Sequence, residues 1–365
     1  MGIIVVVVGT RPEIIKMAPV IKELEKRGLN FIFVHTGQHY DYEMSKLFIE
    51  QLELPRPCIQ FKLNSESPAT QLGEMMIKLE SSLRGIKRNS IMLIQGDTNT
   101  MLAAGLTALK MGLKIGHIEA GLRSYDWRMP EEHNRRMIDH ISDYLFAPTE
   151  VAKKNLIEEH VQGEIYVTGN TIIDTLNMYF DKVEEAEQNV IEKIKFDEYI
   201  LVTFHRAENV DNPQTLRNFI KILKECPLPI VFPIHPRTRK RLQEFGLWSE
   251  ICGIRHLQIL PPQGYFEFLA IMKNCKLILT DSGGIQEEAT HPKIRKFILV
   301  LRTSTERPEA ITYGFARVVG VNPTVVLAEL ERILNARINL PEKTPFGDGQ
   351  ASRRIVDVVQ TKIEE

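Results

Sequence analysis

Short apolar runs alternate with longer segments of helical period along the first half of the chain. The runs cover residues 3–8, 31–34, 91–94 and 115–118, and they are rich in isoleucine and valine. Strands buried on both faces of a parallel sheet form continuous apolar runs of this kind, and the amphipathic segments between them supply the covering helices. The pattern predicts an α/β chain built on parallel sheets.

The same alternation restarts after a charged amphipathic stretch at residues 181–195. Its apolar runs are residues 199–204, 230–233, 277–280 and 297–301. A chain of 365 residues is long for one core and suits two domains. We therefore predict two doubly wound, Rossmann-like domains, at residues 1–169 and 170–350. Residues 351–365 form a final amphipathic segment that the sequence alone does not assign to either domain.

The charge balance changes the list of plausible partners. Lysine and arginine number 46 against 47 aspartates and glutamates, so no chain-wide basic field exists to hold nucleic acid or an anionic membrane. No apolar run approaches the roughly 18 residues that span a bilayer, and the N-terminus has no secretory pattern. We expect a cytoplasmic protein with neither partner.

The four cysteines carry little signal. Cys58, Cys226, Cys252 and Cys275 are scattered, without the spacing of a zinc site or a disulfide framework. We expect all four to be buried thiols and predict no metal site.

Polar motifs follow most of the predicted strands. Helix capping or turn chemistry explains any one of them. The carboxyl ends of parallel strands are also where open α/β sheets bind ligands, so motifs from both halves favour a ligand cleft between two sheets. These motifs occupy residues 9–13, 36–41, 95–100, 117–121, 205–209, 235–237 and 281–284.

The first motif places two cations at the start of a helix. Thr10 and Glu13 have the spacing of a capping box, and Pro12 suits a first helical turn. A helix N-terminus already carries a partial positive charge, so Arg11 and Lys16 favour an anion in this loop. The alternative is an ordinary pair of solvated surface side chains.

The segment Asp281-Ser282-Gly283-Gly284 is the sharper phosphate candidate. Its glycines permit close backbone approach, and a helix predicted to begin near Ile285 directs free N–H groups to the same place. The chain contains neither a Walker motif nor G-x-G-x-x-G after its first strand, which disfavours a dinucleotide cofactor. Glu288 could accept hydrogen bonds from ribose hydroxyls or simply complement the helix dipole.

Three acids form a further candidate group. Asp97 and Glu119 end neighbouring predicted strands, and Glu131 begins a helix. Carboxylates gathered in a closed site beside His205 would suit proton transfer. For Glu132, ordinary helix-dipole chemistry is a sufficient explanation. Neither a nucleophilic triad nor a metal ligand set is recognisable.

Ten ordered motifs together resemble the non-hydrolysing UDP-N-acetylglucosamine 2-epimerases. They are GTRPEIIKMAP, TGQHYD, QGDTNT, HIEAGLRS, PEEHNRRMIDH, TGNTIIDTL, TFHRAEN, PIHPRT, DSGGIQEEA and TERPEA, and they span nearly the whole chain. The resemblance implies a fold of the glycosyltransferase-B type, with the C-terminal helix packed on the first domain, a homodimer and no cofactor.

The resemblance also implies roles for individual residues. The diphosphate of UDP would lie near Arg11, His205, Ser282 and Gly283, with Lys16 and Arg307 nearby; Glu288 would bind the ribose, and Phe268 would lie beside the uracil. The implied catalytic set is Asp97, Glu119, Glu131 and His205, with Arg135 beside it. The implied reaction interconverts UDP-N-acetylglucosamine and UDP-N-acetylmannosamine.

An effector site is a further implication. Gln38, His39 and His235 match the positions at which many bacterial members bind a second UDP-N-acetylglucosamine. Ala69 stands where those members carry an arginine, which puts allosteric activation in question.

Three other functions remain open. A hydrolysing relative would share these motifs and release free N-acetylmannosamine and UDP. A glycosyltransferase would share the fold and the diphosphate loops, although no acceptor site is evident. A sugar-nucleotide sensor would bind without turnover and would not need the acids, all of which are present.

Overall fold

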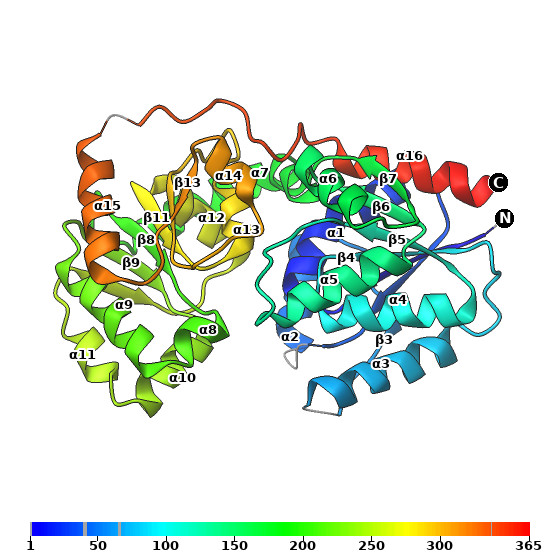
Figure 1. The fold of residues 1–365 in the computed structure, drawn as a ribbon, viewed down its shortest axis with the longest axis horizontal. Helices are drawn as coiled ribbons and strands as arrows, with labels where there is room; N and C mark the ends of the chain where they lie inside the picture. The colour runs from blue at the N-terminus through cyan, green and yellow to red at the C-terminus, as the bar shows by residue number, and fades with distance from the viewer. Residues whose placement is uncertain (1, 39–41, 65–66, 337) are drawn as a thin grey trace. The chain divides into compact units, whose positions relative to one another are not determined.

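The computed structural model describes residues 2–38, 42–64, 67–336 and 338–365 (Figure 1). The chain forms two compact units. Unit 1 comprises Met1–Met178 and Phe346–Glu365, and unit 2 comprises Tyr179–Pro345. The division lies later in the chain than residues 169 and 170, because helix α7 (Thr171–Ile191) begins within unit 1 and crosses into unit 2 at a kink at Tyr179.

Unit 1 is built on a parallel sheet. In its described part, seven strands lie in the order β3-β2-β1-β4-β5-β6-β7. The strand bounds are β1 Ile4–Val8, β2 Phe31–His35, β3 Ile59–Gln60, β4 Ile91–Gln95, β5 Lys114–Ile118, β6 Tyr144–Ala147 and β7 Glu164–Val167.

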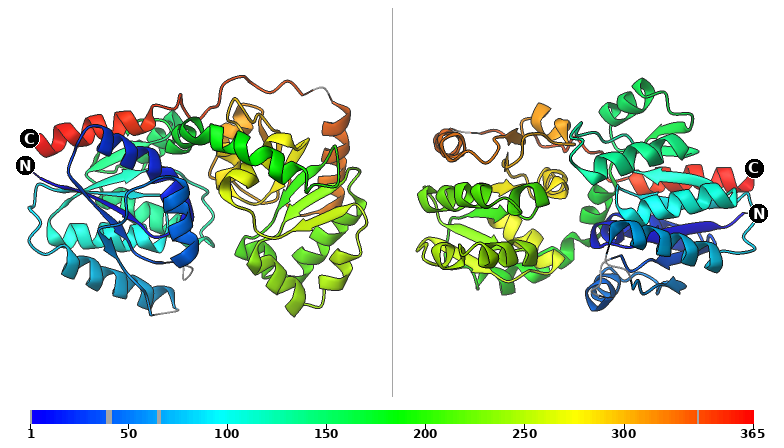
Figure 2. Two further views of the ribbon diagram at one scale, coloured as in Figure 1. Left: turned by 180° about the vertical axis from the view of Figure 1, so that it is seen from behind. Right: turned by 60° about the horizontal axis from the view of Figure 1, so that its bottom comes forward.

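Helices cover both faces of this sheet (Figures 1 and 2). They are α1 Arg11–Lys26, α2 Tyr42–Gln51, α3 Pro68–Ser82, α4 Asn99–Met111, α5 Pro130–Ile141, α6 Glu150–Glu158, the start of α7, and α16 Ala351–Glu364. Helix α16 packs against α1, and Arg27, the C-cap residue of α1, forms an ion pair of 2.6 Å with Asp357 of α16. The last segment of the chain therefore belongs to unit 1.

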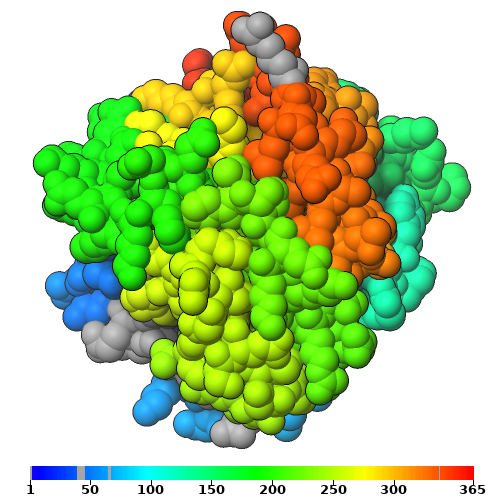
Figure 3. All heavy atoms as spheres, turned by 90° about the vertical axis from the view of Figure 1, so that its left-hand side faces the viewer, coloured from blue at the N-terminus to red at the C-terminus, as the bar shows by residue number. Residues whose placement is uncertain are grey.

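Unit 2 repeats the plan with six described strands in the order β10-β9-β8-β11-β12-β13. The strands are β8 Ile200–Thr203, β9 Ile230–Pro233, β10 Leu257–Leu260, β11 Leu277–Thr280, β12 Ile298–Val300 and β13 Ala316–Val318. The helices are α8 Ala207–Val210, α9 Pro213–Glu225, α10 Pro236–Glu244, α11 Trp248–Cys252, α12 Tyr265–Asn274, α13 Gly283–Glu288, α14 Pro308–Thr312 and α15 Pro323–Asn335. Figure 3 shows one face of this unit, on which α15 (orange) lies beside α9 (light green).

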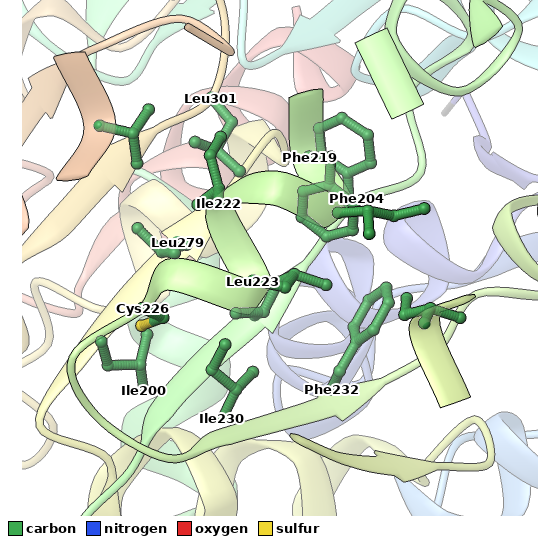
Figure 4. Packing of buried hydrophobic residues seen from close by; sticks show 14 of the residues in the cluster. Ile200, Phe204, Phe219, Ile222, Leu223, Cys226, Ile230, Phe232, Leu279 and Leu301 are labelled. Carbon is green, nitrogen blue, oxygen red and sulfur yellow. The ribbon is translucent and has the colours of Figure 1, made fainter. Parts of the chain in front are cut away.

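Each unit has its own apolar core. In unit 2, Phe219 stacks on Phe204 with ring centroids 4.0 Å apart, and both side chains are buried (Figure 4). In unit 1, β1, β4 and β5 contribute a separate cluster that includes Val5, Met92 and Ile115. Continuous burial along strands such as β1 and β4 is what the apolar runs of the sequence predict.

The structure tests two further predictions, on the burial of the cysteines and on membrane-spanning helices. Cys226 and Cys275 are buried as expected, but Cys58 and Cys252 are exposed, so the prediction of four buried thiols is wrong for those two. Both exposed cysteines lie at the ends of elements rather than within them, where the apolar pattern gives no information on burial. No helix in the described part of the chain is long and apolar enough to cross a membrane.

Both sheets reverse their strand order at one point. In unit 1 the order changes direction between β1 and β4, and in unit 2 between β8 and β11. The crevice outside the carboxyl ends of strands at such a switch point is the usual ligand site of an open α/β sheet. The segments that follow these four strands contain Arg11, Asp97, His205 and Ser282.

Candidate functional site

The loop after β1 packs closely against its neighbours, which leave no room for a side chain at Gly9. A Cβ atom at Gly9 would lie 2.1 Å from the hydroxyls of both Thr36 and Thr100. Helix α1 then begins at Arg11, as the capping pattern predicts, and the Glu13 carboxylate accepts hydrogen bonds from the N–H groups of Gly9 (2.6 Å) and Thr10 (2.8 Å).

Glu13 also joins this loop to the loop after β4. Its second carboxylate oxygen accepts a hydrogen bond from the hydroxyl of Thr98, the residue that follows Asp97. Glu13 is only 2% exposed, and burial raises its pKa to about 7 despite these hydrogen bonds. The sequence identified Glu13 as a capping residue but gave no sign of its burial.

Lys16 has a carboxylate partner within the same unit. Its ammonium group lies 2.6 Å from Oε1 of Glu119, and both side chains are buried. The other oxygen of Glu119 accepts a hydrogen bond from the side-chain amide of Gln95, at the end of β4. The cation at the helix start therefore pairs with an acid of the candidate catalytic set.

Glu119 is held in an unusual backbone conformation. Its φ of +71° lies in the left-handed region, which non-glycine residues rarely occupy. Strain of this kind persists where the surrounding structure fixes a side chain for a task. The contacts of Glu119 with Lys16 and Gln95 hold its side chain in place.

Asp97 forms the second pair of an acid with a cation. Its carboxylate lies 3.2 Å from the guanidinium of Arg135, which is almost fully buried on α5. Glu131 lies one turn earlier on the same helix, and its carbonyl oxygen accepts a hydrogen bond from Nε of Arg135. The predicted residues Asp97, Glu119, Glu131, Arg135 and Lys16 are thus all placed in unit 1 around the ends of β4 and β5.

Glu132 has a larger role than the sequence indicated. The side chain is fully buried, and it accepts hydrogen bonds from the N–H and the hydroxyl of Ser124, each at 2.9 Å. It also pairs with Arg136 at 3.3 Å. Hydrogen bonds from Ser124 and the nearby arginines lower its pKa, although burial acts in the opposite direction. Helix-dipole chemistry therefore does not account for this residue.

In unit 2, His205 is fixed by a buried carboxylate. Asp281 accepts hydrogen bonds from the backbone N–H groups of His205 (3.0 Å) and Arg206 (2.9 Å) and from the amide of Asn209 (3.1 Å). The imidazole Nε2 lies 3.8 Å from Asp281. Partial burial lowers the pKa of His205, while the charge of Asp281 acts to raise it. The motif Asp281-Ser282-Gly283-Gly284 was identified from the sequence, but this role of Asp281 was not predicted.

The glycine-rich segment after β11 forms the start of a helix, as expected. Helix α13 begins at Gly283, two residues before the predicted Ile285, and Ser282 occupies the N-cap position without a side-chain capping bond. A Cβ at Gly283 would lie 2.5 Å from Oε1 of Glu306, so a larger residue there would require the Glu306 side chain to move. Arg307 is buried and pairs with Glu287 at 2.7 Å and with Glu306 at 3.1 Å.

The nucleoside candidates also belong to unit 2. Phe268 is half-buried in the first turn of α12, and Glu288 is buried at the end of α13. Unit 2 thus contains the predicted His205, Phe268, Ser282, Gly283, Glu288 and Arg307. Arg11, whose guanidinium lies 4.3 Å above the ring of Phe48, is in unit 1.

The effector candidates divide between the units. Gln38, in unit 1, accepts a hydrogen bond of 2.7 Å from the N–H of Thr100, and His39 lies outside the described residues. His235, in unit 2, caps α10, and its ring centroid is 5.3 Å from that of His205. Ala69 is exposed in the first turn of α3.

Two doubly wound units, each with polar loops at its switch point, define an α/β protein of the glycosyltransferase-B type, and the predicted fold class is confirmed. A family model described as UDP-N-acetylglucosamine 2-epimerase matches residues 22–360. The chain is 44% identical over 363 residues, 97% of its length and 98% of the relative's, to the UDP-N-acetylglucosamine 2-epimerase of Methanocaldococcus jannaschii. It therefore belongs to the UDP-N-acetylglucosamine 2-epimerase family.

Two further similarities are informative. The crystal structure of the Methanocaldococcus jannaschii enzyme in complex with UDP-GlcNAc and UDP superposes with a TM-score of 0.91 at 42% identity, covering 99% of this chain and 100% of that one. A Pseudomonas aeruginosa relative, 36% identical over 97% of this chain and 98% of its own, is named UDP-2,3-diacetamido-2,3-dideoxy-D-glucuronate 2-epimerase. The family thus includes enzymes named for different sugars.

Proposed function

We propose that the protein is a non-hydrolysing 2-epimerase that interconverts UDP-N-acetylglucosamine and UDP-N-acetylmannosamine. The observation that supports this most directly is the pair of acid and cation sites in unit 1. Asp97 with Arg135 and Glu119 with Lys16 lie at the ends of the adjacent strands β4 and β5. Epimerisation needs one group to remove a proton and another to return one, and these two sites offer carboxylates for both steps.

The reaction proceeds by elimination and re-addition. The proton on C2 is not adjacent to a carbonyl, so a base alone cannot remove it. In the forward step a carboxylate takes the C2 proton, the bond from C1 to the UDP oxygen breaks, and a C1–C2 double bond forms, giving 2-acetamidoglucal and UDP. In the return step UDP adds to C1 while a proton adds to the opposite face of C2, which inverts that centre.

The departing UDP requires stabilisation of its negative charge. Arg11, Lys16, His205 and Arg307 supply positive charge or hydrogen-bond donors, and the N-terminus of α13 at Ser282 and Gly283 supplies backbone N–H groups. Glu288 binds the ribose and Phe268 lies beside the uracil in this proposal.

The proposal is tested by proton and phosphorus NMR of the protein with UDP-N-acetylglucosamine in D2O. We expect UDP-N-acetylmannosamine with deuterium at C2. Free N-acetylmannosamine and UDP would instead identify a hydrolysing enzyme. An unchanged substrate would exclude epimerisation under these conditions, and the same measurement with UDP-2,3-diacetamido-2,3-dideoxyglucuronate would then test the other sugar named among the relatives.

Substitutions test the acids. Asp97→Asn and Glu131→Gln are expected to retain UDP affinity by calorimetry and to lose turnover, because the UDP contacts of the proposal lie on other residues. Glu150→Gln is the matched control, since Glu150 is an exposed acid on α6 whose loss should change neither property. Turnover that survives in both acid variants would remove Asp97 and Glu131 from the chemistry.

The resemblance further implies a homodimer and an effector site at Gln38, His39 and His235. Sedimentation equilibrium should give twice the chain mass of 41.9 kDa. A mass equal to one chain would exclude the dimer.

A further inference from the structure

The segment Gly96–Asp97 is held by side chains from two other elements. His117, on β5, places Nε2 2.9 Å from the carbonyl oxygen of Gly96. On α5, Asn134 donates a hydrogen bond of 2.9 Å to the carbonyl of Asp97, and Arg135 pairs with the Asp97 carboxylate. Gly96 has a φ of +82°, a backbone conformation that glycine adopts without a steric cost.

Both ring nitrogens of His117 face oxygen atoms that accept hydrogen bonds. A carbonyl oxygen can only accept, so Nε2 must carry hydrogen. Nδ1 lies 2.7 Å from the carboxylate of Asp139, which also pairs with Arg123 at 2.7 Å and accepts from the N–H of Gly121. Hydrogen bonds and charges from His117 and Arg123 lower the pKa of Asp139 although burial opposes them, so this carboxylate is ionised. His117 therefore bridges the carbonyl of Gly96 and the carboxylate of Asp139.

Ion pairs connect His117 back to Asp97 through the interior of unit 1. Asp139 pairs with Arg123, Arg123 with Glu159 at 2.6 Å, and Glu159 with Arg136 at 2.8 Å. Arg136 then pairs with Glu132 at 3.3 Å, Glu132 with Arg135 at 3.6 Å, and Arg135 with Asp97. We call this set the charge ring. It consists of His117, Arg123, Arg135 and Arg136, alternating with Asp97, Glu132, Asp139 and Glu159.

The charge ring closes on a single loop. One end reaches the carbonyl of Gly96 through His117, and the other reaches the carboxylate of Asp97 through Arg135. Its three arginines and His117 alternate with its four carboxylates, so each carboxylate of the ring has a basic partner. The side chain of Asp97 is 31% exposed, more than any other member, and therefore this is the member that solvent or a ligand can reach.

We propose that His117 is a positioning residue for the epimerisation reaction, which fixes the Asp97 carboxylate by its hydrogen bond to the carbonyl of Gly96. This inference rests on the proposed function of Asp97 in proton transfer. A carboxylate that removes a proton from carbon must approach it closely, and displacement by about 1 Å can reduce a rate by about 100-fold. His117 therefore affects the placement of the Asp97 carboxylate and does not affect UDP binding.

Two substitutions separate the contacts of His117. In His117→Gln the side-chain amide can replace Nε2 and keep a donor to Gly96, whereas in His117→Asn the shorter amide replaces Nδ1 and keeps only the contact with Asp139. We expect His117→Asn to reduce kcat on the order of 10- to 100-fold with unchanged UDP affinity. His117→Gln should restore most of this loss. Lys114→Gln, at the exposed opposite end of β5, is the control.

The outcomes are distinct. A wild-type protein that fails to place deuterium at C2 contradicts the proposed function, whatever the variants do. If the wild type is active, equal kcat in His117→Asn and wild type overturns the inference, as does an equal loss in both His117 variants. Should His117→Asn fail to fold, His117→Gln alone decides, because it must retain kcat.

A measurement without turnover tests the same contact. In protein labelled with nitrogen-15 histidine, the signals that His117→Gln removes should show hydrogen on Nε2. A ring without hydrogen on Nε2 would contradict its hydrogen bond to the carbonyl of Gly96.

Discussion

At the scale of single residues, the chemistry of the candidate site depends on a few buried acids. Glu13, Glu119 and Glu132 are all buried, yet each has a different set of partners. Glu119 has a lysine, Glu132 has arginines and backbone donors, and Glu13 has N–H groups and a hydroxyl. Because Glu13 accepts its hydrogen bonds from neutral donors, burial dominates and its pKa rises to about 7.

This burial predicts a pH dependence of stability. Between pH 4.5 and about 7, folded Glu13 holds its proton while the unfolded chain releases it. The free energy of unfolding should therefore fall as pH rises through this range, by up to about 1.4 kcal/mol per pH unit, and level off above it. Glu13→Gln has no proton to release. Urea titrations at several pH values should therefore show that the free energy of unfolding of the wild type, minus that of the variant, decreases as pH rises. A constant difference would contradict the prediction.

At the scale of elements, helix ends decide where the functional groups lie. Helix α5 places Glu131 and Arg135 on one face and Glu132, Arg136 and Asp139 on the neighbouring face, as a period of 3.6 residues requires. Arg135 on the first face pairs with Asp97, and Arg136 and Asp139 on the other face form further ion pairs of the charge ring. A single helix thus joins the candidate site to its supporting network.

Helix α16 depends on a cap from another part of the chain. The Asp174 carboxylate, on α7, accepts hydrogen bonds from the N–H of Ala351 and from the N–H and hydroxyl of Ser352. Asp174→Ala should lower the free energy of unfolding by about 1–2 kcal/mol, because it leaves the first turn of α16 without its acceptor. Ser352→Ala keeps the backbone bonds and should have a smaller effect in the same urea titration. Equal effects would show that the hydroxyl, not the helix cap, matters.

At the scale of the whole molecule, the chain has two separate cores. Phe219 and its neighbours are buried within unit 2, and the cluster that contains Leu79 is buried within unit 1. Each unit therefore has the apolar interior that an independently cooperative domain requires.

Substitutions in one core should destabilise the unit that contains it and leave the other unit folded. Phe219→Ala removes a ring stacked 4.0 Å from Phe204 and should cost about 3–5 kcal/mol in the stability of unit 2. Hydrogen exchange followed by mass spectrometry should show lost protection within residues 179–345, and Leu79→Ala should show the reverse pattern. Protection lost equally throughout the chain after either change would contradict two separate cores.

Much of the architecture could be predicted from the sequence. The apolar runs at residues 3–8 and 91–94 predicted β1 and β4, and the T-x-x-E pattern predicted the start of α1, because strand burial and helix capping depend on residues close together in the chain. The polar motifs predicted that the candidate residues follow strands. Motif order also predicted the family, which the comparisons confirm.

The sequence alone therefore determined the fold class, the family and the positions of the candidate residues along the chain. Only the tertiary structure decided which of them are paired and which are buried. Lys16 meets Glu119, and His117 meets Gly96 and Asp139, across long separations in sequence. The charge of such groups depends on desolvation and on the partner within a few ångströms, and neither is a local property of the chain.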